Sequence, residues 1–305
     1  MKTINLGGSG LEASVIALGC MRISEMSVTE LSALVDKCFE LGISFFDHAD
    51  IYGGGVCEEL FGKVLKENPP MRKDMIIQSK CGIRKGFFDF SGQYILDSTE
   101  GILKRLGIDS LDILLLHRPD TLMEPDEVAK AFNALYASGK VKHFGVSNMN
   151  PAQIDFLQDA LGQKLIVNQL QFSAAHTGMI DNGIYVNMKV EQSNVRDGSI
   201  LEYCRRKKIT IQTWSSLQYG FFEGTFLNSE KYPKLNDVLK RIADERGVEK
   251  SAVAIAWILR HPAKMQVVPG TTNTARLTAL AKATDIELDR QEWYEIYEAA
   301  GNELP

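Results

Sequence analysis

The sequence predicts an α/β protein, a (β/α)8 TIM barrel that forms one domain over residues 1–305. About eight short apolar runs alternate with segments of helical periodicity, which is typical of a parallel sheet. The runs are continuously apolar, as expected of strands that are buried on both faces. Eight such units in one chain favour a closed barrel over an open, doubly wound sheet.

The expected elements follow one another in a regular order. Strands are expected at 15–18, 45–48, 75–79, 112–116, 143–146, 166–170, 209–213 and 265–268. Helices are expected at 28–41, 58–65, 94–106, 124–138, 151–161, 198–207, 235–246, 252–260 and 274–283. Ser27-x-x-Glu30 is a capping box at the start of the first helix, and Gly107 and Gly139 end two later helices.

Three features are additions to the repeating pattern. Residues 6–11 link two short extended runs and predict an N-terminal β-hairpin, although they also contain a loose dinucleotide fingerprint, Gly8-x-Gly10-x-x-Ala13. We reject the fingerprint because a strand, not a helix, is expected to follow it. A long polar segment, 173–197, follows the sixth strand and is expected to act as a functional loop such as a substrate lid. An extra helix at 290–300 ends the chain.

Composition excludes several classes of function. The net charge of −5 comes without a basic stripe, so we expect no nucleic-acid partner. No apolar run is long enough to span a bilayer, so we expect no membrane partner, and the N-terminus shows no signal peptide. The five cysteines form no Cys-x-x-Cys pair, which predicts neither a disulfide framework nor a metal site and indicates a cytoplasmic protein. The chain is compatible with a monomer.

Polar side chains recur where the predicted strands end. They are Asp47 and then Tyr52, Lys80, His117, Ser147 with Asn148, Gln169, and Trp214. Each residue alone would usually have a structural role, but in a barrel these positions converge on the carboxyl-end mouth. We therefore predict a site there.

Four of these residues suit proton transfer to a carbonyl oxygen. The ordinary pKa of tyrosine is about 10, and the Lys80 ammonium is expected to lower the pKa of Tyr52. Asp47 would hold Lys80 charged, and His117 would orient the carbonyl as a neutral donor. None of the four can donate a hydride, so a redox reaction needs a cofactor.

The ordered set of motifs resembles the aldo-keto reductase superfamily, and its details are closer to YdhF-like bacterial oxidoreductases than to aldose reductase. The motifs are Asp47 with Tyr52-Gly53 and Glu58, Lys80, Leu116-His117-x-Pro119-Asp120, Gly139-Lys140 with Gly145-Val146-Ser147-Asn148, Gln169, Trp214-Ser215-x-Leu217, and Pro269-Gly270-Thr271.

The resemblance implies NADP(H)-dependent reduction of small aldehydes or ketones to alcohols. It implies Tyr52 as the general acid, assisted by Lys80 and Asp47, with His117 orienting the substrate. It further implies a nicotinamide held by Ser147, Asn148, Gln169 and a stacking Trp214. Met21, Ser215, Leu217, Gly220, Gly270, Thr271, Thr272 and Arg276 are the other implied cofactor residues, the last four around the adenosine 2′-phosphate.

Some positions depart from the pattern of the superfamily. Gly270-Thr271 stands where many relatives have Lys-Ser, and Ala279 and Leu280 stand where a Glu and an Asn are familiar. Arg276 keeps NADP(H) ahead of NAD(H). The rim of the substrate pocket is expected to include Met21, Arg22, His48, Phe87, Phe88 and parts of 173–197.

Two other functions compete with carbonyl reduction. A Schiff-base lyase or aldolase would use Lys80 as its nucleophile, but it leaves Trp214 and Ser147-Asn148 without a role. A cofactor-sensing partner subunit with little turnover is the other alternative, and the intact set of four proton-transfer residues counts against it.

Overall fold

The computed structural model describes all residues from 1 to 305 and contains an eight-stranded parallel sheet. Its strand order is β14-β11-β10-β9-β8-β5-β4-β3. The strands are β3 (Leu18–Gly19), β4 (Phe45–Asp47), β5 (Ile76–Cys81), β8 (Leu111–Leu116), β9 (Val141–Ser147), β10 (Leu165–Gln171), β11 (Thr210–Trp214) and β14 (Gln266–Val267). All eight predicted strands are therefore present. Seven differ from the prediction by small shifts at their ends, and the first, expected at 15–18, shares only Leu18 with β3.

Hydrogen bonds between the last and first strands close the sheet. Ala17 donates its N–H to Val267 O at 2.8 Å, and Val267 donates to Val15 O at 2.8 Å. Gly19 donates to Pro269 O at 2.9 Å one step further along. These bonds join β14 to the segment that leads into β3, which confirms the predicted (β/α)8 barrel.

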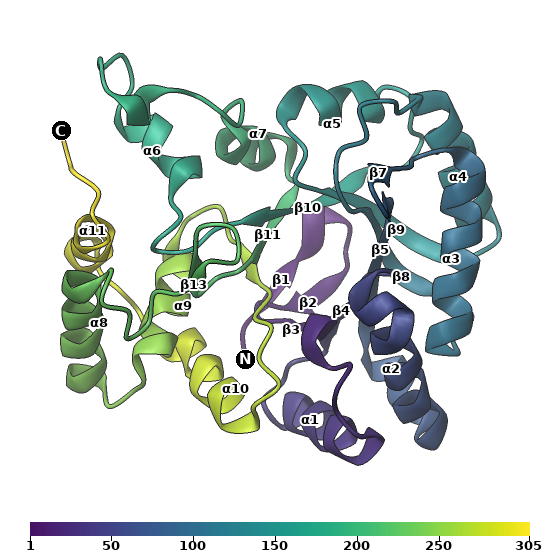
Figure 1. Ribbon diagram of the computed structural model, residues 1–305, viewed down its shortest axis with the longest axis horizontal. Coiled ribbons are helices and arrows are strands. Elements are labelled where there is room, and N and C mark those ends of the chain that lie inside the picture. The colour runs from purple at the N-terminus through teal and green to yellow at the C-terminus, as the bar shows by residue number, and fades with distance from the viewer.

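Helices form a ring around the strands (Figure 1). They are α1 (Val28–Glu40), α2 (Val56–Glu67), α3 (Gly92–Leu106), α4 (Pro125–Ala137), α5 (Pro151–Gln158), α6 (Gly178–Ile184), α7 (Ile200–Lys207), α8 (Pro233–Arg246), α9 (Lys250–Arg260), α10 (Thr274–Ala281) and α11 (Arg290–Ala299). The capping box of Ser27 and Glu30 is present at α1, and Gly107 ends α3 in the left-handed conformation that favours glycine. No helix has the length and apolar composition needed to cross a membrane.

The predicted N-terminal hairpin closes the amino-end of the barrel. Strands β1 (Thr3–Asn5) and β2 (Glu12–Ser14) pair antiparallel, and Leu6 between them is buried against barrel residues such as Phe45 and Ile113. Gly7 donates its N–H to Thr210 Oγ1 at 2.8 Å. A Cβ at Gly7 would lie 2.6 Å from the backbone of Ile166, so only glycine fits there. Because this turn is a hairpin plug, no dinucleotide-binding loop exists at residues 8–13.

The long segment after β10 contains α6, which sequence patterns did not predict. Tyr297 of α11 donates a hydrogen bond to Asp181 of α6 at 2.8 Å, and Tyr185 bonds the backbone of Glu303. Both contacts tie the segment to the C-terminal end of the chain. Two small hairpins were also missed, β6 (Ile83–Arg84) with β7 (Phe87–Phe88), and β12 (Gln218–Tyr219) with β13 (Gly224–Thr225).

Candidate active site

The polar residues at the strand ends meet in one cleft at the carboxyl-end mouth of the barrel. Its volume is about 1000 Å³. The predicted residues that line it are Asp47, Tyr52, His117, Met21, Ser147, Asn148, Gln169, Trp214, Ser215, Leu217, Gly270, Thr271, Thr272 and Arg276. Two predicted residues do not line it: Lys80 is fully buried behind Asp47 and Tyr52, and Gly220 lies outside.

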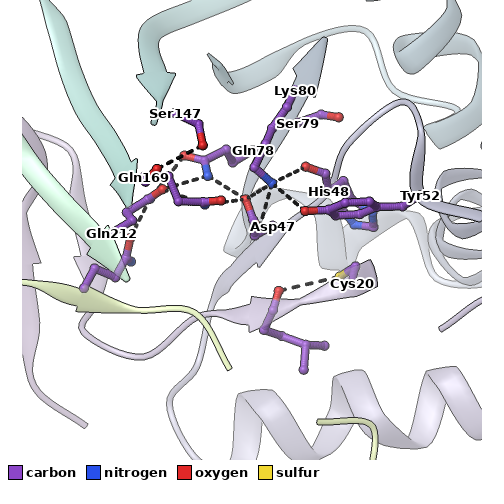
Figure 2. A network of polar contacts seen from close by, with 12 residues as sticks. Cys20, Asp47, His48, Tyr52, Gln78, Ser79, Lys80, Ser147, Gln169 and Gln212 are labelled. Atoms are coloured by element: carbon purple, nitrogen blue, oxygen red, sulfur yellow. Dashed lines mark hydrogen bonds and ion pairs between the residues drawn. The ribbon is translucent and has the colours of Figure 1, made fainter. Parts of the chain in front are cut away.

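Lys80 is the centre of a buried hydrogen-bond cluster (Figure 2). Its Nζ lies 2.8 Å from both carboxylate oxygens of Asp47 and 2.8 Å from the backbone oxygen of His48. It also lies 3.2 Å from Tyr52 Oη. An ammonium has three donors and no acceptor, so these groups satisfy Lys80 completely.

Burial by itself would lower the pKa of Lys80, but Asp47 and Tyr52 together raise that pKa above its ordinary value. Lys80 is therefore a charged ammonium at neutral pH.

The pKa of Tyr52 differs from the sequence-based expectation. Burial raises it, Lys80 lowers it, and Asp47 raises it again, so the pKa is above its ordinary value. The expected net lowering by Lys80 is thus wrong for this structure, because desolvation of a phenolate outweighs the attraction of one ammonium that Asp47 already neutralises. Tyr52 carries its proton at neutral pH.

His117 faces Tyr52 across the cleft, with ring centroids 6.0 Å apart in an edge arrangement. Burial, Lys80 and Arg118 all lower the pKa of His117 well below its ordinary value. The imidazole is therefore neutral, as predicted. Its Nδ1 is buried without a partner.

A layer of buried glutamines supports Asp47, and of its members sequence reasoning assigned only Gln169, as a cofactor residue. Gln78 donates to Asp47 Oδ1 at 2.6 Å and Gln169 donates to the same oxygen at 3.1 Å. Gln212 exchanges hydrogen bonds with Gln78 and donates to Gln266 Oε1 at 2.7 Å. The register of neighbouring strands brings these side chains together, since Asp47 pairs with Gln78, and Gln212 pairs with both Gln169 and Gln266.

A second polar group holds the indole of Trp214. Ser147 Oγ donates to the backbone oxygen of Gln169 at 2.9 Å, and Asn148 donates to Ser147 Oγ at 2.7 Å. The indole N–H of Trp214 donates to Asn148 Oδ1 at 3.2 Å. These bonds set the ring of Trp214 at the cleft wall next to the predicted amide-binding residues.

The opposite end of the cleft offers hydroxyls and a cation without an acidic partner, Arg276. Ser215 donates to Gln218 Oε1 at 2.7 Å, and Asn273 caps α10 by accepting from the backbone N–H of Arg276. The Arg276 side chain has no carboxylate within 4.0 Å. A helix N-terminus with an unpaired guanidinium suits a phosphate.

The predicted rim is only partly correct. Met21 and Arg22 line the cleft, but His48 is fully buried against Phe61, and the pair Phe87 and Phe88 lies outside. Residues 173–197 do not line the cleft either, so their expected place on the rim is wrong, whereas a role as a lid stays a prediction. The lining residues that sequence reasoning missed include Ile51, Ile83, Arg118, Phe221, Phe222, Glu249 and Lys250.

Comparison with known proteins agrees with this geometry. A family model for the aldo/keto reductase family matches residues 15–300. The chain is 38% identical over 303 residues to a 6-dehydroglucose reductase of Agrobacterium fabrum, covering 95% of both chains. It is 34% identical over 317 residues to oxidoreductase YdhF of Escherichia coli, covering all of both chains.

A solved structure gives the same result for the fold. The thermostable aldo-keto reductase Tm1743 superposes with a TM-score of 0.78 at 26% identity, covering 98% of this chain and 100% of that one. A match over nearly the whole chain, together with the barrel and its cleft, shows that this protein is an oxidoreductase that belongs to the aldo/keto reductase family.

Proposed function

We propose that the protein reduces aldehydes or ketones to alcohols with NADP(H), and that Tyr52 is the proton donor. The observation that carries this proposal is the chain of contacts from Asp47 through the Lys80 ammonium to Tyr52 Oη at the cleft. The family to which the chain belongs supports carbonyl reduction with a nicotinamide cofactor.

The hydrogen bond between Lys80 and Tyr52 leaves the phenolic proton free. Lys80 is the donor at 3.2 Å and Tyr52 Oη the acceptor, so the O–H of Tyr52 can donate to a substrate oxygen in the cleft. When the proton moves to that oxygen, the phenolate that forms already has an ammonium beside it. Asp47 and its glutamine partners keep the ammonium in place.

His117 can orient the same carbonyl oxygen. A neutral imidazole has one N–H donor and bears no charge that would compete for the proton. Two donors on one oxygen, His117 and Tyr52, would stabilise the negative charge that develops there.

When bound, a reduced nicotinamide supplies the hydride for the carbonyl carbon and is itself oxidised. The cleft fits such a group, because it joins the indole face and amide side chains at one end to hydroxyls and an unpaired guanidinium at the other. Ser147, Asn148, Gln169 and Trp214 would hold the nicotinamide end, with Met21 on the neighbouring wall. Ser215, Leu217 and Gln218, which all line the cleft, would lie along the pyrophosphate.

The 2′-phosphate of NADP(H) would lie by Gly270, Thr271, Thr272 and Arg276. Arg276 offers a planar bidentate donor for which the fold provides no carboxylate partner. This is the reason to place NADP(H) ahead of NAD(H).

The contacts of Lys80 argue against the Schiff-base alternative. The side chain of Lys80 is fully buried and does not line the cleft. Its contact with Asp47 raises its pKa, so the amine is charged. An amine nucleophile must be neutral and must reach the substrate.

The variant Tyr52→Phe tests the proposal. It removes only the donor hydroxyl, so NADPH affinity should stay within a few-fold while the reduction rate falls by about 10²–10⁴-fold, the usual contribution of a general acid. The control is Tyr136→Phe, which changes an exposed tyrosine on α4. Unchanged turnover by Tyr52→Phe would refute the role of Tyr52, and equally slow turnover by the unaltered protein would favour the cofactor-sensing function.

A further inference from the structure

Arg118 lies at the substrate end of the cleft. It follows His117 directly, two residues after β8 ends, and lines the cleft. Its guanidinium carbon lies 5.5 Å from the ring centroid of Trp214 and 5.7 Å from that of Phe221. The side chain is thus held over two aromatic rings, next to the residues proposed to bind the carbonyl.

The charge of Arg118 has no partner in the protein. Four arginines of the chain are partly buried, namely Arg72, Arg105, Arg118 and Arg246. Three of them bind carboxylates: Arg72 binds Asp112 at 2.9 Å, Arg105 binds Glu58 at 2.7 Å, and Arg246 binds Glu292 at 2.5 Å. Arg118 alone has no carboxylate within 4.0 Å and donates no side-chain hydrogen bond.

The acidic residues that line the cleft do not compensate for this charge. They are Asp47, which binds Lys80, and Glu249, which precedes α9 at the other end of the cleft. Arginine stays charged in proteins even when it is partly buried. An unpaired guanidinium beside a substrate position is therefore suited to an anionic group of the substrate.

We propose that Arg118 forms an anion subsite and that preferred substrates are aldehydes or ketones that also carry a carboxylate. This inference rests on the proposed carbonyl reduction at the same site. During the reaction the carbonyl carbon gains a hydride and its oxygen a proton, while the carboxylate stays unchanged and serves only for recognition. The planar fork of Arg118 matches a carboxylate in two parallel hydrogen bonds, and the ring of Phe221, which lines the cleft beside Arg118, offers an apolar surface for the carbon skeleton between the two groups.

The cofactor is a less suitable partner for Arg118. The phosphate-binding features, Arg276 and the capped start of α10, lie at the far end of the cleft. Arg118 instead follows His117 in the chain, and its charge contributes to the low pKa of His117. Its place is therefore beside the proton-transfer residues.

Pairs of substrates that differ only in charge test whether Arg118 recognises a carboxylate. The 3- and 4-carboxybenzaldehydes are compared with the corresponding formylbenzamides, which have nearly the same shape but no charge. For the unaltered protein with NADPH, we expect kcat/KM to be at least about tenfold higher for one acid than for its amide, as one charge-assisted hydrogen bond provides. In Arg118→Met this ratio should fall to about one. The control Arg84→Met removes an arginine that also lies over aromatic rings, but outside the cleft, and should keep the ratio of the unaltered protein.

Two results would overturn the inference. One is a ratio near one for both isomers in the unaltered protein, and the other is a ratio that Arg118→Met leaves unchanged, whether or not the variant loses NADPH affinity. Calorimetric binding of the product acids and amides in the presence of NADPH separates this inference from the proposed function. Charge-dependent binding that needs Arg118, without any turnover, would contradict carbonyl reduction and support the subsite.

Discussion

Replacing Asp47 by Asn tests whether the buried ion pair holds Lys80 charged beside Tyr52. The side chain of Lys80 is fully buried and that of Asp47 is 3% exposed. The variant removes the negative charge, and the amide N–H groups of Asn would meet either the ammonium or the donors of Gln78 and Gln169. Every alternative leaves a buried charge or donor without an acceptor.

The expected cost follows from that burial. Removing one partner of a buried ion pair destabilises a protein by about 3–5 kcal/mol. With an unfolding entropy of about 2.1 cal/mol/K per residue, a chain of 305 residues loses about 5–8 °C of Tm. The exposed Asp36 on α1 provides the control, and Asp36→Asn should leave Tm unchanged.

The pH dependence of stability should differ between the variant and the unaltered protein. In the unaltered protein the pKa of Lys80 is raised, so its stabilisation is present below the ordinary pKa and is lost as pH rises through the raised one. In Asp47→Asn the strongest effect that opposes burial is removed and only Tyr52 still raises that pKa. We therefore expect burial to lower the pKa of Lys80 below its ordinary value, so that the unfolded chain binds the extra proton. Stability should then increase as pH rises from 7 toward 10.

Thermal unfolding followed by circular dichroism at pH 7, 8.5 and 9.5 measures both effects. A Tm of Asp47→Asn within 2 °C of the Tm of the unaltered protein would refute the expected cost of breaking the buried ion pair. In the unaltered protein the Lys80 contribution to stability should stay level over this range, which lies below the ordinary pKa of lysine. Stability of the variant that stays level or falls with pH would refute the account of the Lys80 charge.

Two further variants test the cofactor end and the hairpin plug. Arg276→Ala should weaken NADPH binding by about 10–100-fold, as loss of a hydrogen bond to a charged group does, and leave NADH binding unchanged; equal effects on both would reject the 2′-phosphate contact. Gly7→Ala should lower Tm because its Cβ would lie 2.6 Å from Ile166, whereas Gly8→Ala, with φ +69° and no atom within 4 Å, reports the backbone strain alone. If both variants lose the same Tm, the close approach to Ile166 does not matter.

The sequence predicted the barrel well because each strand carries its own local signal. Strands such as 112–116 are continuously apolar, and helix boundaries such as Ser27 and Gly107 depend on residues within one turn. Helix α6 was missed because its stability depends on contacts with a distant segment, and the two hairpins were missed because strands of two residues are too short to show an alternating pattern. The bond between Tyr297 and Asp181 spans α11 and α6, and no local pattern encodes it.

The candidate site also contains residues that the sequence could predict and residues that depend on the folded structure. Asp47, Tyr52 and His117 could be found because strand ends converge in a barrel. The glutamine layer could not, since it depends on strand register, and a lone Gln in an apolar strand such as Gln78 or Gln212 carries no recognisable pattern. The raised pKa of Tyr52 depends on how deeply its hydroxyl is buried, which only the packed structure provides.

The most direct test of the account is the fate of the hydride. The protein is incubated with NADPH deuterated at the transferable position of C4 and a panel of aldehydes, and the alcohols are analysed by mass spectrometry and NMR. The account predicts one deuterium on the carbinol carbon for each NADPH oxidised, and loss of that product in Tyr52→Phe. NADPH that binds but yields no deuterated alcohol from any aldehyde would contradict carbonyl reduction.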